Sequence, residues 1–223
     1  MINRYALAGL LAVLAVVGLG ALGVFVVSAG DGGSNPRPTD RAADTGAPPA
    51  PSATPTAGGK VTKLPAQKTK ALAQAAKLAG CTVSTAPDEG NEHVTRPVTA
   101  ADYGTNPPTS GVHNPEWASD EIYQPGNTPD LGTLVHTLEH GRIDIQYHPG
   151  TDPTTISLLG QLYKQMDGGY HLLLFENSTD MPFAVAATAW DHLLGCPKMN
   201  GKVFDAIRAF TATYIDKGPE TVP

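Results

Sequence analysis

Residues 134–148 read LVHTLEHGRIDIQYH and place a short helix directly before a strand. Gly141 is the expected joint, because glycine readily adopts the left-handed conformation that ends many helices. After it, Ile143, Ile145 and Tyr147 alternate with polar residues, which is the pattern of a half-buried strand. A helix that passes through one glycine into a strand is typical of a domain in which helices pack on a sheet.

The residues after this stretch continue the alternation of helix and strand. A helix is predicted over 152–166, because Asp152 can cap it and a proline occupies its first turn. Apolar runs at 170–175 and 183–190 predict two buried strands. An apolar stripe at helical spacing predicts a last helix over 202–215.

The residues before the opening stretch are less regular. Strong helix formers at 66–78, followed by Gly80, predict one helix. The segment 82–130 is rich in proline, glycine and asparagine, and we expect a long irregular segment of the kind that often carries function. The fold class is therefore α+β, a small single sheet with packed helices. Thioredoxin-like domains share the trailing strand–strand–helix order, but the chain lacks CxxC, which argues against redox chemistry.

The N-terminus carries an apolar run at 6–27, about 22 residues and long enough to span roughly 30 Å of hydrocarbon. Arg4 precedes the run and Asp31 is the first charge after it, so the N-terminus is expected in the cytoplasm and the rest outside. We therefore predict a single-pass membrane anchor over residues 1–28. The alternative is a cleaved signal peptide, but the apolar part of such peptides is usually shorter.

Residues 29–62 are predicted to form a disordered linker, because 23 of the 29 residues from Asp31 to Gly59 are Pro, Gly, Ala, Ser or Thr. The exported globular α+β domain then covers residues 63–223. The chain has a net charge of −6 and no basic cluster beyond the membrane segment, which argues against nucleic acid as a partner. The expected partners are the membrane, through the N-terminal helix, and a cell-envelope protein.

Two cysteines, Cys81 and Cys196, are the whole complement. In an oxidising compartment an even number favours a disulfide, whereas thiolate metal ligands are the alternative. Neither cysteine has a CxxC neighbour, so we favour the disulfide. Closing so long a loop would stabilise the fold by up to ~4.7 kcal/mol in the chain-entropy account.

His136 and His140 share one face on either a helix or a strand. With Glu139 they match the HxxEH pattern of inverted zinc metallopeptidases, in which two histidines bind zinc and the glutamate is the general base. Those enzymes need a distant glutamate as third ligand. Here Glu176 falls in a predicted strand and Glu220 in the C-terminal tail, which weakens the peptidase interpretation.

His113 offers a different third ligand. It lies in the irregular stretch PPTSGVHNPEW at 107–117, where prolines stiffen the chain and Gly111 permits a sharp turn. If this loop folds back over His136 and His140, the three imidazoles form a site. Three histidines with water in the fourth position suit zinc, and copper also accepts imidazoles.

A purely structural role for these residues is the competing interpretation. His140 would be favoured at a helix C-terminus by the helix dipole. Glu139 would pair with Arg142, three residues later. His113 would be a turn residue that bonds its own loop. A domain of this kind would be a non-enzymatic interaction module of the cell envelope.

Two blocks carry a resemblance to a known family: PPTSG-x-H at 107–113, preceded by Tyr103, and VH-x-LEHG at 135–141. With them the chain resembles a bacterial family of unknown function, DUF3105, from about Cys81 to the last helix. The resemblance implies a membrane segment, a linker and this domain in that order. No reaction, substrate or cofactor comes with it, so it implies only that the two histidine blocks belong to one domain.

We therefore expect a membrane-anchored extracytoplasmic domain that binds a transition metal, zinc or copper, through His113, His136 and His140. Glu139 would support the ligands or act as general base. The alternatives are the interaction module with structural histidines and a metal-dependent hydrolase. Whether the domain is an enzyme stays open at this point.

Overall fold

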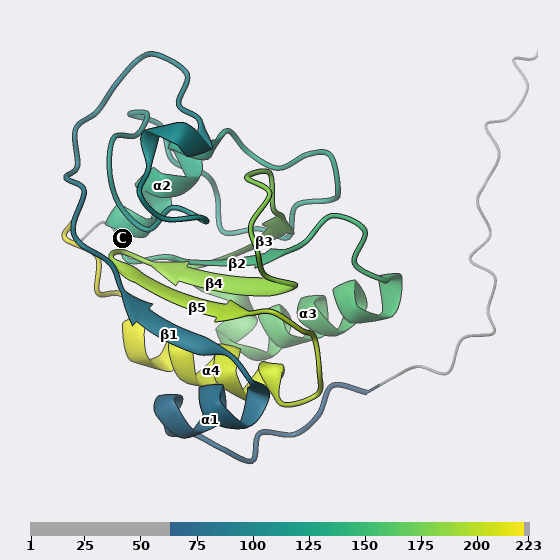
Figure 1. Cartoon of the computed structure of the whole chain (residues 1–223). Coiled ribbons are helices and arrows are strands. Elements are labelled where there is room, and N and C mark those ends of the chain that lie inside the picture. Colours follow the sequence, from purple (N-terminus) through teal and green to yellow (C-terminus); the bar gives the residue numbers. More distant parts are fainter. Residues whose placement is uncertain (1–62, 221–223) are drawn as a thin grey trace, which may run out of the picture. The chain divides into compact units, whose positions relative to one another are not determined.

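A computed structural model describes residues 63–220, which form one five-stranded sheet with helices on both faces (Figure 1). The expected α+β domain with a single sheet and packed helices is confirmed. In chain order the elements are α1 (Leu72–Ala79), β1 (Thr82–Thr85), the 3-10 turn η1 (Ala100–Asp102), α2 (Leu131–Glu139), β2 (Ile143–Tyr147), α3 (Pro153–Gln165), η2 (Asp167–Gly169), β3 (Leu172–Glu176), β4 (Val185–Ala189), β5 (His192–Cys196) and α4 (Val203–Tyr214).

The strand order in the sheet is β1-β5-β4-β2-β3. Strands β2 and β3 are parallel, and α3 connects them as the long crossover that parallel pairing requires. Strand β4 lies antiparallel to β2, and β4 and β5 form a hairpin in which Asp191 adopts a φ of 61°. Strand β1 is an edge strand and pairs antiparallel with β5. The first strand of the chain is therefore separated from the central strand, β4, by β5.

The main core lies between the sheet and α1, α3 and α4, which all cover the lower face in Figure 1. Alternate residues of β2, namely Ile143, Ile145 and Tyr147, point into it and are at most 1% exposed. The expected helices over 152–166 and 202–215 are confirmed as α3 and α4. Their apolar stripes are buried because three helices share this one face.

Helix α2 and the long irregular segment cover the opposite, upper face of the sheet (Figure 1). There Leu134 packs with Leu173 and Phe175 of β3. Strand β2 is therefore buried along its whole length, and the expectation of a half-buried strand is wrong. Its polar residues Asp144 and Gln146 face the α2 layer, where hydrogen bonds replace water: Thr137 Oγ1 lies 3.1 Å from Asp144 Oδ1.

Burial of Asp144 predicts a pH-dependent stability. Burial raises the pKa of this carboxyl group well above its usual range, so the folded protein keeps a proton that the unfolded chain loses as pH rises. The free energy of unfolding therefore falls as pH rises from the unfolded pKa to the folded one. Asp144→Asn, which still accepts from Thr137, should be more stable than the wild type at pH 8, with a smaller difference at pH 4.5.

Urea unfolding of both proteins at the two pH values measures this difference. The matched control is Asp180→Asn, at an exposed aspartate, which should follow the wild type at both pH values. An equal loss of stability at pH 4.5 and pH 8 in Asp144→Asn would contradict the prediction.

Two strands were missing from the sequence-based expectation. The segment 82–130 was expected to be irregular throughout, yet it begins with β1 and contains η1. Strand β5 lies in the stretch 191–201, for which the sequence predicts no element. Helix α1 begins at Leu72, several residues later than expected, with Gly80 at a φ of 72° as its C-terminal stop. The irregular character of the rest of 82–130 is confirmed.

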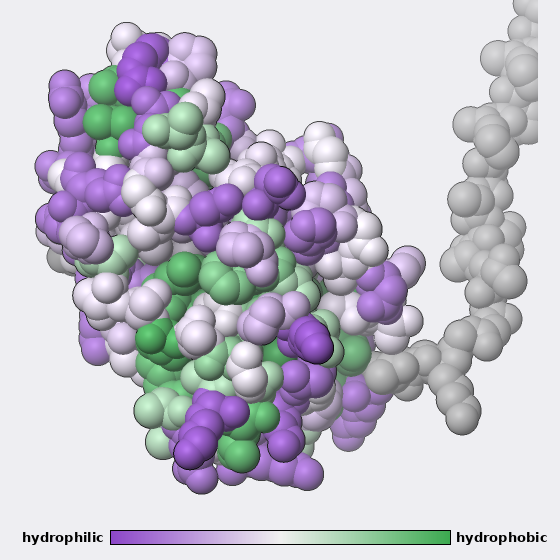
Figure 2. Space-filling view, in the orientation of Figure 1, coloured by the Kyte–Doolittle hydropathy of each residue, from purple (hydrophilic) through white to green (hydrophobic). Residues whose placement is uncertain are grey.

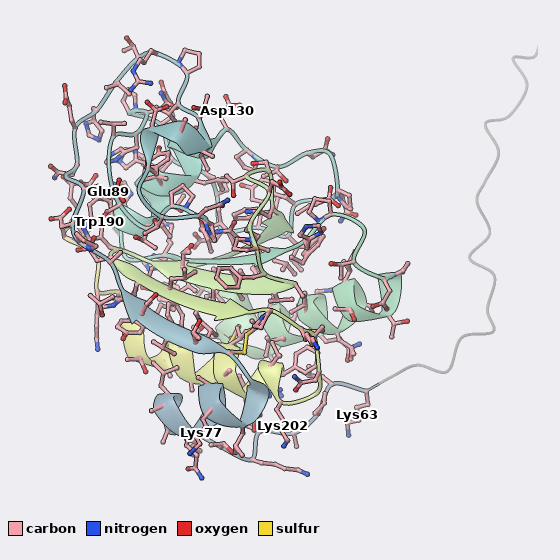
Figure 3. All side chains as sticks on the ribbon, in the orientation of Figure 1. Lys63, Lys77, Glu89, Asp130, Trp190 and Lys202 are labelled. Carbon is pink, nitrogen blue, oxygen red and sulfur yellow. A yellow bond between two sulfur atoms is a disulfide. The ribbon has the colours of Figure 1, made fainter. Side chains whose placement is uncertain are left out.

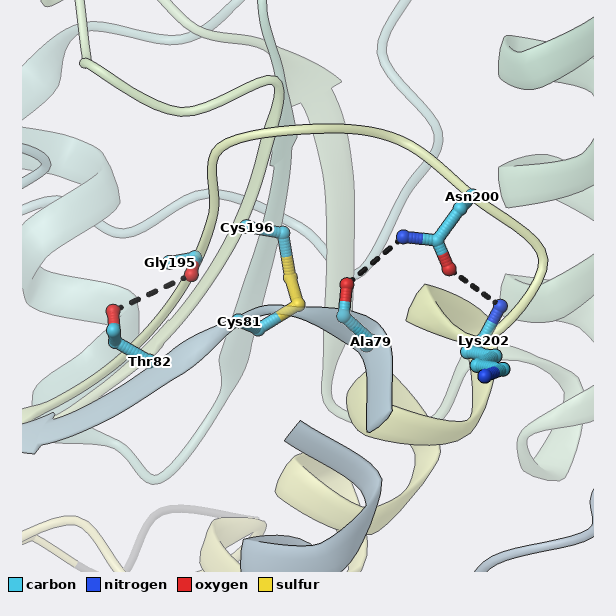
Figure 4. The surroundings of a disulfide bond; sticks show 7 residues. All are labelled: Ala79, Cys81, Thr82, Gly195, Cys196, Asn200 and Lys202. Atoms are coloured by element: carbon cyan, nitrogen blue, oxygen red, sulfur yellow. Dashed lines mark hydrogen bonds between the residues drawn. A yellow bond between two sulfur atoms is a disulfide. The ribbon is translucent and has the colours of Figure 1, made fainter. Parts of the chain in front are cut away.

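The disulfide between Cys81 and Cys196 is confirmed and closes a separation of 115 residues (Figure 4). It joins the residue before β1 to the last residue of β5. Beside it, Asn200 Nδ2 donates to the Ala79 carbonyl and Thr82 Oγ1 to the Gly195 carbonyl. The crosslink therefore fastens α1 and the edge strand to the rest of the sheet.

The predicted membrane anchor (1–28) and linker (29–62) lie outside the described residues. Within 63–220, every helix is too short or too polar to cross a bilayer. The surface in Figure 2 shows its apolar side chains mainly over the lower half, on the side of α1. Among the described residues, the large apolar side chains that stay exposed are Leu78, Trp117 and Tyr170.

Candidate metal centre

The C-terminal turn of α2 supplies three polar side chains that are all buried. His136 is 3% exposed, Glu139 0% and His140 4%. The helix ends here because Gly141 adopts a φ of 77°, as expected from the sequence. His136 and His140 converge, with ring centroids 4.4 Å apart, and Glu139 Oε2 lies 3.9 Å from His136 Nε2.

The loop 107–113 folds back over α2 and brings His113 to the same place. Gly111 makes the turn possible with a φ of 117°, at a position where a Cβ would press on the Tyr103 ring. The Tyr103 hydroxyl donates to the Val112 carbonyl at 2.7 Å and holds the loop from behind. His113 is fully buried as a result, and its Nε2 lies 3.0 Å from Glu139 Oε2.

A fourth histidine, His93, joins the cluster from the first part of the irregular segment. It forms an isolated parallel β-bridge with His113, in which the His113 amide donates to the Glu92 carbonyl. The His93 ring stands 4.7 Å from that of His113 and 4.8 Å from that of His136. Its side chain is 47% exposed, so the cluster meets solvent at this residue.

Glu139 is the centre of the arrangement. Its Oε2 lies 3.0 Å from His113 Nε2, 3.8 Å from His93 Nε2 and 3.9 Å from His136 Nε2. The potential ligand atoms of these four residues all lie within 4.8 Å of one another. In His113 the other ring nitrogen, Nδ1, donates to the Gly111 carbonyl at 2.8 Å, which leaves Nε2 with a free lone pair in the neutral ring.

A second group overlaps the first. It consists of His136, Glu139, His140 and Glu220, whose potential ligand atoms again lie within 4.8 Å of one another. Glu220 Oε2 is 3.5 Å from His140 Nε2. Glu220 does lie in the C-terminal tail, but the tail is not frayed at this residue, because the Glu220 amide donates to the Glu139 carbonyl at 3.0 Å and fixes the tail against α2.

Several polar atoms of the cluster are buried without a hydrogen bond. Among the described residues, the buried side-chain atoms of this kind include both carboxylate oxygens of Glu139, His113 Nε2 and His140 Nδ1. A buried ionised carboxylate without donors is costly, and native structures rarely retain one without a counter-ion or metal.

The imidazoles of α2 are disposed to be neutral. Burial lowers the pKa of His136, and the neighbouring His113 and His93 lower it further. Burial also lowers the pKa of His140, with His136 as the next cause. The neutral imidazole is the form that binds metal ions.

Trp117 packs against the two imidazoles of α2. Its ring centroid lies 4.9 Å from that of His140 and 5.6 Å from that of His136, both edge to face. Its side chain is 49% exposed. The tryptophan therefore shields the two imidazoles from solvent on one face.

The predicted ligands fall into two overlapping groups. His113 and His136 come together with Glu139, but His113 and His140 fall in different groups, so a common ion for all three histidines stays a prediction. His93 was missed, because its local sequence, NEHVT, carries no ligand spacing and only the bridge to His113 places it. The suggested pairing of Glu139 with Arg142 is wrong, since Arg142 Nε donates to Asp120 at 2.7 Å.

Comparison with known proteins gives one family. A family model described as "protein of unknown function (DUF3105)" matches residues 93–222, more than half of the chain. The match begins at His93 and contains every member of both ligand groups. No curated protein and no solved structure matches the chain.

Proposed function

Because the chain belongs to the DUF3105 family, whose description names no function, we propose one from the site itself: the domain binds a transition metal, zinc or copper. The proposed ligands are His93, His113, His136 and Glu139. Relative to the sequence-based expectation, His93 joins the ligand set, Glu139 changes from a supporting residue to a ligand, and His140 leaves the set.

One observation carries the proposal: a fully buried glutamate has both oxygens without a hydrogen-bond donor and faces three imidazoles. A metal ion would compensate the charge of Glu139 and use the free lone pairs of the rings. Four nitrogen and oxygen ligands in tetrahedral geometry, at ~2.0–2.2 Å from an ion, are roughly 3–3.5 Å apart. The observed separations of 3.0–3.9 Å from Glu139 Oε2 need only small adjustments of the side chains.

The surroundings of the cluster favour cations. The segment 86–130 contains eight aspartates and glutamates against the single Arg96. Figure 3 shows Glu89 and Asp130 at this end of the domain and Lys63, Lys77 and Lys202 at the other. An excess of negative charge at this end of the domain raises the local concentration of metal ions.

The cellular setting is part of the proposal. The disulfide Cys81–Cys196 supports an oxidising compartment, and the apolar run at 6–27 supports a membrane anchor that holds the domain outside the cytoplasm. A cell-envelope protein as partner stays a prediction.

The direct test is metal content. After removal of metals with a chelator and exposure to Zn²⁺ or Cu²⁺, the full chain should retain at least one ion, and saturating metal should raise the melting temperature by about 5–10 °C. His113→Ala should retain one ion fewer than the wild type and lose most of this rise in melting temperature. His148→Ala, at a residue whose ring Nδ1 only contacts the Pro149 carbonyl at the far end of β2, should match the wild type in both.

The interaction-module alternative predicts the opposite pattern. If the histidines were only structural, His113→Ala would lower the melting temperature by the same amount with metal and with chelator. A wild-type chain without retained metal would contradict the proposed function.

A further inference from the structure

We propose that the cluster holds two metal ions bridged by the Glu139 carboxylate, the second bound by His140 and Glu220 of the C-terminal tail. This inference rests on the proposed function, which requires only the first ion. The ligands of the first ion stay His93, His113, His136 and Glu139 Oε2. The second ion would be bound by Glu139 Oε1, His140 and Glu220.

Both carboxylate oxygens of Glu139 need a partner. The Oε2 atom faces His93, His113 and His136, whereas Oε1 is equally buried and also lacks a hydrogen-bond donor. One tetrahedral ion at Oε2 would leave Oε1 unsatisfied in a dry environment, which is unfavourable. A carboxylate that bridges two ions uses both oxygens, as in two-metal sites with ions about 3.5–4 Å apart.

His140 and Glu220 are placed as ligands of a second ion. They approach to 3.5 Å between Nε2 and Oε2, and with Glu139 their potential ligand atoms lie within 4.8 Å of one another. His140 is 2% exposed at the side chain, whereas Glu220 is 48% exposed. Three protein ligands with one solvent-facing side leave a position for water, which is the ligand count of catalytic zinc sites.

Backbone hydrogen bonds hold the C-terminal tail against the end of α2, beside His140. The Asp216 amide donates to the Gly141 carbonyl at 2.9 Å, and the Glu220 amide donates to the Glu139 carbonyl. Between them, a Cβ at Gly218 would overlap the Glu139 carbonyl oxygen and the Gly141 nitrogen. The close approach of the two backbones therefore depends on glycine at 218 and brings the Glu220 carboxylate to His140.

The experiment compares metal stoichiometry in four full-length proteins: wild type, Glu220→Gln, His140→Ala and the control Glu121→Gln. Glu121 is an exposed glutamate of the segment beside β3. After chelation and equilibration with Zn²⁺, elemental analysis should give two ions per chain for the wild type and the control, and one for Glu220→Gln. His140→Ala should also retain one ion, and a cooperative melting transition of each metal-free variant shows that it folds.

Loading with Cu²⁺ tests the bridge. Two carboxylate-bridged Cu²⁺ ions couple magnetically, so the wild type should give a weakened or coupled electron paramagnetic resonance signal, and Glu220→Gln a full isolated one. One zinc per wild-type chain, two ions in Glu220→Gln, or two uncoupled copper ions in the wild type would each overturn the inference and leave the proposed function standing. No bound ion in the wild type would overturn both.

Discussion

Replacing Glu139 with glutamine is expected to weaken zinc binding by at least about 100-fold, because even residues that only support ligands cost 10–100-fold when they are changed. The same change should leave the metal-free protein at least as stable as the wild type. Glutamine has the same shape without the charge, and its amide can donate to His113 Nε2, 3.0 Å from the present oxygen. Removing an uncompensated buried charge is neutral or stabilising, by roughly 1 kcal/mol here.

This variant separates the two interpretations, because it should weaken zinc binding and yet leave the metal-free protein at least as stable as the wild type. Melting temperatures of wild type and Glu139→Gln should be compared with chelator and with excess Zn²⁺, and affinities by titration calorimetry. Metal should stabilise the wild type and leave the variant unchanged. Glu121→Gln serves as the control for loss of one carboxylate elsewhere. A metal-free variant that is several kcal/mol less stable than the wild type would indicate a structural His113–Glu139 ion pair and count against the metal site.

The part of the site that could be predicted lies on one short element. Helix spacing alone makes His136, Glu139 and His140 neighbours, and Gly141 marks where the helix ends. His113 could be predicted as a ligand because Gly111 allows its loop to turn toward α2. These inferences need only local geometry, which a sequence expresses directly.

The remaining ligands depend on contacts between distant segments. His93 reaches the cluster through backbone pairing with His113, twenty residues later, and Glu220 through backbone bonds to the end of α2. Neither residue has a neighbour that signals a ligand. Such pairings are set by the packing of the whole upper layer, so no spacing in the sequence reveals them.

The missed strands have a similar cause. Strand β1 has only four residues, TVST, of which three are exposed, so it lacks the apolar alternation that marks a strand. Strand β5 contains Gly195, which is unfavourable in a strand, yet it is required because a Cβ there would overlap the Phe183 ring. Strand β5 forms because it pairs with β4, and β1 forms because it pairs with β5, to which the disulfide also joins it.

Removal of that disulfide should have the largest effect on stability. The pair Cys81→Ala and Cys196→Ala is expected to lower the free energy of unfolding by about 2–5 kcal/mol, because the crosslink restricts a separation of 115 residues in the unfolded chain. For a domain of this size the melting temperature should fall by roughly 4–20 °C. Zinc binding below the transition should stay unchanged, since the cluster lies on the other face of the sheet from α1 and α4.

The wild type treated with a phosphine reductant separates the crosslink from the loss of two side chains. Cys196 is 1% exposed, so alanine there also leaves a small cavity. The reduced wild type keeps both sulfurs and should melt within a few degrees of the double variant if the crosslink dominates. If the reduced wild type has the same melting temperature as the oxidised protein, the stability lost in the double variant comes from the cavity and not from the missing crosslink. In that case packing through Ala75, Ala76 and Ala79 would hold α1, and pairing with β5 would hold β1.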